Sequence, residues 1–161
     1  MKDMLKKGSL RIIDVNLLDG KEMLEGLEQN KERRYPLRGR VHLEVVTNQG
    51  TLTVTTAAGF EFDGRSGPSI IDFYVPNLGS LEEKVCWLVH DCNGYGQGLS
   101  FKDTNILLYA MLRHYAKYKP AKANVIQLAV SLSKSWYGIP AEDDWCHRNI
   151  GLVNTSWEAK C

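Results

Sequence analysis

Two stretches in the first half of the chain alternate apolar and polar residues with a period of two. They are Val41–Val45 and Thr51–Thr55, and Asn48-Gln49-Gly50 lies between them as a turn whose glycine tolerates positive φ. This pattern predicts a β-hairpin with one buried face, made of Val41, Leu43, Val45, Leu52 and Val54. A β-branched run over residues 10–15, ended by Asp19-Gly20, predicts an earlier strand.

The second half of the chain instead repeats apolar residues at helical spacing. Ser80-Leu-Glu-Glu83 is a capping box and predicts a helix that buries Val85, Leu88, Val89 and Cys92. Ser100 is a second N-cap, and the helix after it presents Ile106, Leu107, Ala110, Met111 and Leu112. Pro120 suits the first turn of a third helix, whose predicted apolar face is Val125, Leu128, Ala129 and Leu132.

Strands followed by helices predict an α+β fold, in which a small antiparallel sheet that includes the hairpin packs against about three helices. The 161 residues suit a single domain. Residues 139–161 are expected to be a C-terminal tail that packs on the rest, because they contain Trp145 and Trp157.

Composition narrows the classes of function. The formal net charge is +1, from 20 basic and 19 acidic side chains, which gives no electrostatic signal for nucleic acid. No apolar run reaches the roughly 18 residues of a membrane span, and the first residues lack the apolar core of a secretory signal. The four cysteines show no CxxC spacing and are expected to be reduced thiols in a cytosolic product. Zinc held by Cys86, Cys92, Cys146 and His147 is an alternative with no standard spacing.

Candidate chemistry gathers between Gly59 and Asp103. Five acid, hydroxyl and imidazole groups there are expected to converge on one point: Asp63, Ser66, His90, Asp91 and Asp103. Each also has a structural interpretation. Asp63 and Ser66 are turn formers, His90 suits a satisfied core position, and Asp103 suits the positive end of a helix dipole.

Two catalytic assemblies remain open. In the first, Asp63, His90 and Asp91 or Asp103 hold a divalent metal that activates water for hydrolysis. In the second, Ser66 is a nucleophile, His90 is its base and an aspartate orients the imidazole. The second ranks lower because the sequence around Ser66 is not a GxSxG elbow.

The order of these motifs resembles a known family. The matching residues are Gly59-Phe60, Asp63-Gly64, Ser66 and Pro68 in one turn, then His90-Asp91, then Asp103. They are similar to the "GF-x-x-D-x-x-S-x-P" turn and "HD" helix of a tailed-phage and prophage family, domain of unknown function number thirteen fifty-three. The resemblance covers about residues 41–138.

The resemblance implies a phage or prophage origin but no activity. The first hypothesis is therefore a virion or tail-associated structural or accessory protein, whose polar cluster is a buried network and whose partners are other phage structural proteins. The alternative is a metal-dependent hydrolase acting on host cell wall or another phage-related substrate, with Asp63, His90 and Asp103 as ligands and Asp63, Ser66, His90 and Asp91 as candidate catalytic residues. Either protein would be made in the bacterial host cytoplasm, and the first would join the virion.

Overall fold

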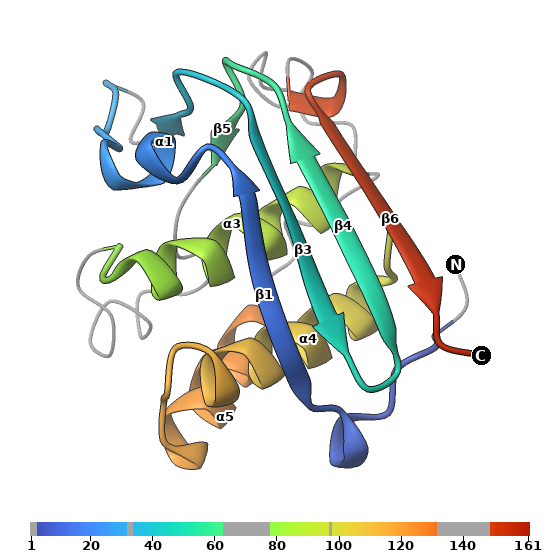
Figure 1. Ribbon diagram of the computed structural model, residues 1–161. Helices are drawn as coiled ribbons and strands as arrows, with labels where there is room; N and C mark the ends of the chain where they lie inside the picture. The colour runs from blue at the N-terminus through green and yellow to red at the C-terminus, as the bar shows by residue number, and fades with distance from the viewer. Residues whose placement is uncertain (1–2, 32–33, 63–77, 97, 132–148) are drawn as a thin grey trace.

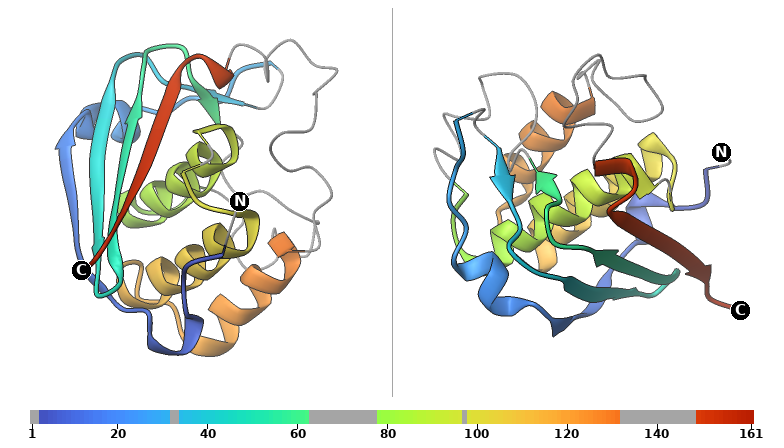
Figure 2. Two further views of the ribbon diagram at one scale, coloured as in Figure 1. Left: turned by 90° about the vertical axis from the view of Figure 1, so that its right-hand side faces the viewer. Right: turned by 90° about the horizontal axis from the view of Figure 1, so that it is seen from above.

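The computed structural model describes residues 3–31, 34–62, 78–96, 98–131 and 149–161. A four-stranded antiparallel sheet forms one layer, and two of the three long helices lie against one of its faces, while the third packs against the second of them (Figure 1). The views in Figure 2 show the same arrangement from the side and from above. The predicted α+β class, with a small antiparallel sheet and about three helices, is confirmed.

The predicted hairpin forms the centre of the sheet. Strand β3 (Val41–Thr47) pairs with β4 (Gly50–Thr56), with Val45 opposite Leu52 and Leu43 opposite Val54. All five residues of the predicted apolar face have no solvent-exposed surface. The period of two therefore identified the face that meets the helices.

The C-terminal residues form an edge strand, which the sequence analysis did not predict. Strand β6 (Val153–Ala159) pairs antiparallel with β4, so the sheet order is β1-β3-β4-β6. Trp157 lies over Gly50, where an added Cβ would be 2.4 Å from Cζ2 of the indole. The end of the chain thus belongs to the sheet and is more than a packing tail.

The other edge strand, β1 (Ile12–Asp19), begins two residues later than the predicted run and ends at the predicted Asp19. Its pairing with β3 skips Ile13 and Leu18, which marks two bulges. Helix α1 (Lys21–Glu25) follows directly. Flanking elements are the 3-10 turn η1 (Lys7–Ser9) and a two-stranded sheet of β2 (Tyr35–Pro36) and β5 (Glu61–Phe62).

The helical layer consists of α3 (Leu81–Gly96), α4 (Phe101–His114) and α5 (Pro120–Ser131). The capping box before α3 is confirmed: the Ser80 amide donates to Glu83 Oε1 at 3.1 Å and the Glu83 amide donates to Ser80 Oγ at 3.2 Å. The Tyr118 hydroxyl also donates to Glu83, which links the segment before α5 to the start of α3.

The predicted apolar face of α5 was wrong in part. The buried residues are Ala123, Ile126, Ala129 and Val130, whereas Leu128 is 62% exposed. Leu132 lies outside the described residues. Apolar residues occur around most of this helix, so their spacing does not specify one stripe. Packing against α4 selects the stripe that is buried.

Candidate functional site

The structure places three of the five predicted site residues. His90 and Asp91 lie on α3, and Asp103 lies in the first turn of α4. All three are buried. Asp63 and Ser66 lie outside the described residues, so whether they meet the other three stays a prediction.

Asp103 anchors the N-terminal segment of the chain. Its Oδ2 accepts the Met4 amide at 2.6 Å, and its Oδ1 accepts the Leu5 amide at 3.0 Å. Its own amide donates to the N-cap Ser100 Oγ at 3.1 Å. The side chain is completely buried, and the helix dipole favours a negative charge at this position. Both carboxylate oxygens are therefore committed to backbone amides.

The N-cap residue Ser100 also binds Asp3, the residue before Met4. The Ser100 hydroxyl donates to Asp3 Oδ1 at 2.7 Å while its oxygen accepts the Asp103 amide. Residues 3–5 are thus held on the amino end of α4 by side chains from the cap and the first turn. These hydrogen bonds fix the N-terminal segment to a helix that lies far away in the sequence.

His90 has a different neighbour from the one the sequence suggested. Its Nε2 lies 3.0 Å from Asn105 Oδ1, which joins α3 to α4. Nε2 carries the hydrogen when the amide oxygen accepts. The His90 Nδ1 atom is 3.7 Å from Asp91 Oδ1, beyond hydrogen-bond length. The metal hypothesis paired His90 with Asp103, but the residue found beside the imidazole is Asn105.

Asn105 was missed because only acids, hydroxyls and imidazoles were considered. A usable signal was present in the sequence, since Asn105 shares one helical face with Phe101, Leu108 and Leu112; in the structure it is 4% exposed. A buried amide inside an apolar stripe requires a hydrogen-bond partner. That requirement predicts a polar residue on the neighbouring helix, and His90 fulfils it.

Asn93 is a second buried amide, three residues after His90 on α3. It is completely buried, and neither its Oδ1 nor its Nδ2 has a hydrogen-bond partner in the part of the chain that the structure describes. An unpaired buried amide costs about 1–3 kcal/mol. The carboxyl half of α3 therefore retains unused polar capacity close to His90.

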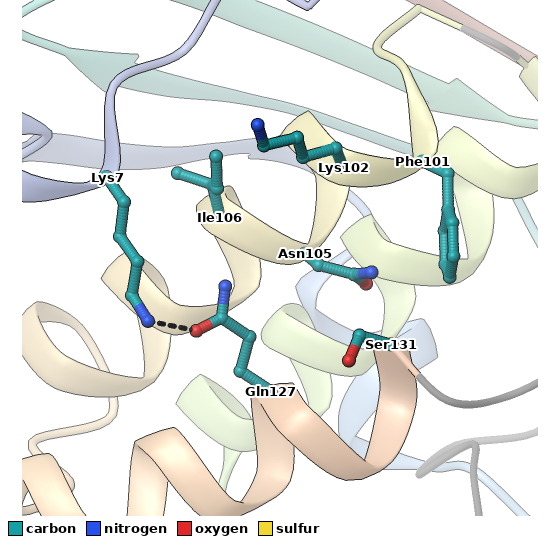
Figure 3. A pocket seen from close by; sticks show the side chains of 7 residues that line it. All are labelled: Lys7, Phe101, Lys102, Asn105, Ile106, Gln127 and Ser131. Carbon is teal, nitrogen blue, oxygen red and sulfur yellow. Dashed lines mark hydrogen bonds between the residues drawn. The ribbon is translucent and has the colours of Figure 1, made fainter.

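A cavity of about 310 Å³ lies between α4, α5 and the N-terminal segment. Figure 3 shows the amide of Asn105 among its lining side chains, which are Lys7, Phe101, Lys102, Asn105, Ile106, Gln127 and Ser131. Lys7 Nζ donates to Gln127 Oε1 at 2.5 Å and so spans one side of the cavity. The lining is mostly apolar, and the Lys7 ammonium already donates to Asn124 and Gln127, so the cavity suits a small apolar group.

The described residues include no group of three or more histidine, cysteine, aspartate or glutamate side chains arranged to hold a metal ion. Cys86 and Cys92 are completely buried. Burial raises the pKa of both thiols, and the nearby Glu83 raises that of Cys86 further. Both are therefore protonated and unreactive at neutral pH. The other two residues of the zinc alternative, Cys146 and His147, lie outside the described residues.

Two further findings concern the class of protein. Among the described helices, none is long and apolar enough to cross a membrane. No protein-family model, no curated protein and no solved structure matches this chain.

Proposed function

We propose that this protein is a structural or accessory component of a tailed-phage particle, associated with the virion or its tail. In this role the buried polar residues of α3 and α4 maintain the fold, and the partners are other phage structural proteins. The structural role rests on one observation, the Asp103 carboxylate. It has no exposed surface, and its two oxygens accept the Met4 and Leu5 amides.

Further support comes from the pairing of His90. The imidazole is 3% exposed and is hydrogen-bonded to an amide on the neighbouring helix. A buried, paired network makes a fold rigid, which suits a part that must hold its shape in an assembly. The phage assignment itself rests on the resemblance of the turn and the His90-Asp91 motif to the phage family.

Particle association is the experiment that tests the proposal. Particles of the phage or lysogen that encodes the chain are purified on a density gradient, and each fraction is probed for the protein. The expected result is a constant ratio of this protein to the major capsid protein across the particle band. Recovery only in the soluble fractions, with normal particles formed when the gene is deleted, would overturn the proposal.

A second candidate function is the metal-dependent hydrolase, and one observation favours it. Asn105, which is hydrogen-bonded to His90, also lines the 310 Å³ cavity, so the Asn105 side chain would lie between a substrate there and the imidazole. The ligand set must differ from His90 with Asp103, because the Asp103 oxygens already accept two amides. Asp91, the next residue on α3, is a candidate acid, and Asp63 stays a candidate from the sequence alone.

The hydrolase is tested by the clearing of purified host cell wall with added Mn²⁺ or Zn²⁺. Wild type is compared with His90→Gln, and Lys119→Gln serves as the control because this residue lies before α5 and away from the cavity lining. Metal-dependent clearing that is lost in His90→Gln, while the variant stays folded, would favour the hydrolase. Equal absence of clearing in all three proteins removes this candidate.

A further inference from the structure

The outer edge of β6 carries backbone groups that pair with nothing in the described residues. Lys160 donates its amide to Gln49 and Leu152 accepts the Ala57 amide, so even-numbered residues direct their backbone toward β4. The register between the two strands has no shift, and the alternation therefore holds throughout β6. The residues whose amides and carbonyls point away from β4 are Val153, Thr155, Trp157 and Ala159. Thr155 is 8% exposed, and its hydroxyl accepts the Gly98 amide. Figure 2 (left) shows this strand on the near side of the sheet.

The opposite edge of the sheet is built differently. Strand β1 has bulges at Ile13 and Leu18, and bulges interrupt the regular row of donors and acceptors that another strand needs. Strand β6 has no bulge, proline or lysine, and Glu158 is its one charged residue. Devices that block edge pairing are thus present on β1 and absent from β6.

We propose that two copies of this chain associate through β6, which pairs antiparallel with β6 of the second copy about a two-fold axis at Ser156. This register uses every outward backbone group of the strand, because Thr155 lies opposite Trp157 and Val153 opposite Ala159 of the second copy. The result is one continuous sheet across both copies. A two-fold axis makes the interface self-complementary by construction.

The side chains and the charge both suit a second copy as the partner. In this register the Glu158 carboxylate lies opposite the Asn154 amide, and no like charges face each other. The net charge of +1 gives little long-range repulsion between two copies. Ser156 lies opposite its own equivalent in a pair that is not hydrogen-bonded through the backbone, where the Cα atoms are about 4.5 Å apart.

The inference goes beyond the proposed function and does not depend on it, since a particle component and a hydrolase could both be dimers. A monomer in solution would overturn the dimer and leave particle association standing. Absence from particles would leave the dimer standing.

The test is the molecular mass in solution, measured by sedimentation equilibrium from micromolar to millimolar protein. Wild type is expected to move from 18.2 kDa toward twice that mass as its concentration rises. Ser156→Lys and Ser156→Glu each place two like charges at the two-fold axis, so the dissociation constant of each is expected to rise at least about tenfold. An equimolar mixture of the two variants is expected to restore the dimer.

Thr53→Lys is the matched control. Thr53 is the register partner of Ser156 on β4, so the added charge is on the same face but one strand inside the edge. It is expected to leave the dissociation constant unchanged, and circular dichroism checks that all variants are folded. A wild type that stays monomeric would overturn the proposal. A dimer that tolerates Ser156→Lys, or one that the mixture fails to restore, would also overturn it.

Discussion

The polar residues of the helical layer form two groups, of which one borders a cavity and the other does not. Around Asp103, both carboxylate oxygens, the backbone amide and the cap hydroxyl all have partners. Around His90, the imidazole has the Asn105 amide as its partner, and Asn105 also borders a cavity. A fully used group stabilises a fold, whereas a group at a cavity wall retains capacity for a ligand.

The same difference explains why residue types alone predicted Asp103, and not Asn105, as the neighbour of His90. Asp103 was a candidate site residue because it is a carboxylate, but the Met4 and Leu5 amides occupy both of its oxygens. Asn105 carries no charge, yet its position in the interface between α3 and α4 places it beside both His90 and the cavity. If function resides in this part of the molecule, Asn105 and His90 are better candidates than Asp103.

The largest effect is expected from Asp103→Ala. Removing the carboxylate leaves the Met4 and Leu5 amides without their acceptor in a buried position, so the free energy of unfolding should fall by about 3 kcal/mol. Asp103→Asn retains one oxygen acceptor and should cost about half as much. Urea unfolding monitored by circular dichroism measures both. A change below about 0.5 kcal/mol for Asp103→Ala would contradict the anchor role.

A smaller loss, about 2 kcal/mol, is expected from His90→Ala, because it opens a small space and leaves the Asn105 oxygen unpaired. A double-mutant cycle with Asn105→Ala should give a coupling energy of about 1 kcal/mol. A parallel cycle of His90→Ala with Asp103→Asn serves as the comparison. Equal coupling in the two cycles would show that the two groups are not distinct.

The N-cap contributes less. Ser100→Ala should lower the free energy of unfolding by about 1 kcal/mol, since it removes the acceptor of the Asp103 amide and the donor to Asp3. Ser80→Ala, at the cap of α3, is the matched control because it removes an exposed cap without touching the N-terminal segment. The proteolysis rate near residues 3–7 should rise for Ser100→Ala only.

The smallest perturbation is chemical labelling of the thiols, which leaves the native state unchanged. Burial raises the pKa of Cys86 and Cys92, whereas Cys161 is exposed. Iodoacetamide at mildly alkaline pH should therefore modify Cys161 at least about a hundredfold faster than either buried thiol. Peptide mapping by mass spectrometry resolves each site. Rapid modification of Cys92 would contradict this expectation, because it would show that the reagent reaches the buried side of α3 two residues from His90.

The sequence was most informative where local chemistry and packing agree. The alternation in β3 and β4 identified the buried face, and Ser80 and Ser100 located the starts of two helices, because each signal acts within a few residues. Strand β6 was missed because its role depends on pairing with β4, about a hundred residues earlier. The buried face of α5 was misassigned because Leu128 and Ile126 are equally apolar and only contact with α4 distinguishes them.

The site was less predictable for a related reason. His90, Asp91 and Asp103 were all correctly expected to be placed by helices, but their partners lie far away in the sequence. Met4 and Leu5 reach Asp103 from the start of the chain, and a backbone amide leaves no signature in a residue pattern. Whether Asp63 and Ser66 join His90 stays a prediction.

The most direct test of the account is the linkage between metal and stability at Asp103. Wild type and Asp103→Asn are unfolded in urea with excess Mn²⁺ or Zn²⁺ and again with EDTA. If Asp103 is an anchor for the N-terminal segment, the difference in unfolding free energy between the two proteins will be the same in metal and in chelator. A wild type that is stabilised by the metal, with that stabilisation lost in Asp103→Asn, would contradict the account and make Asp103 a metal ligand.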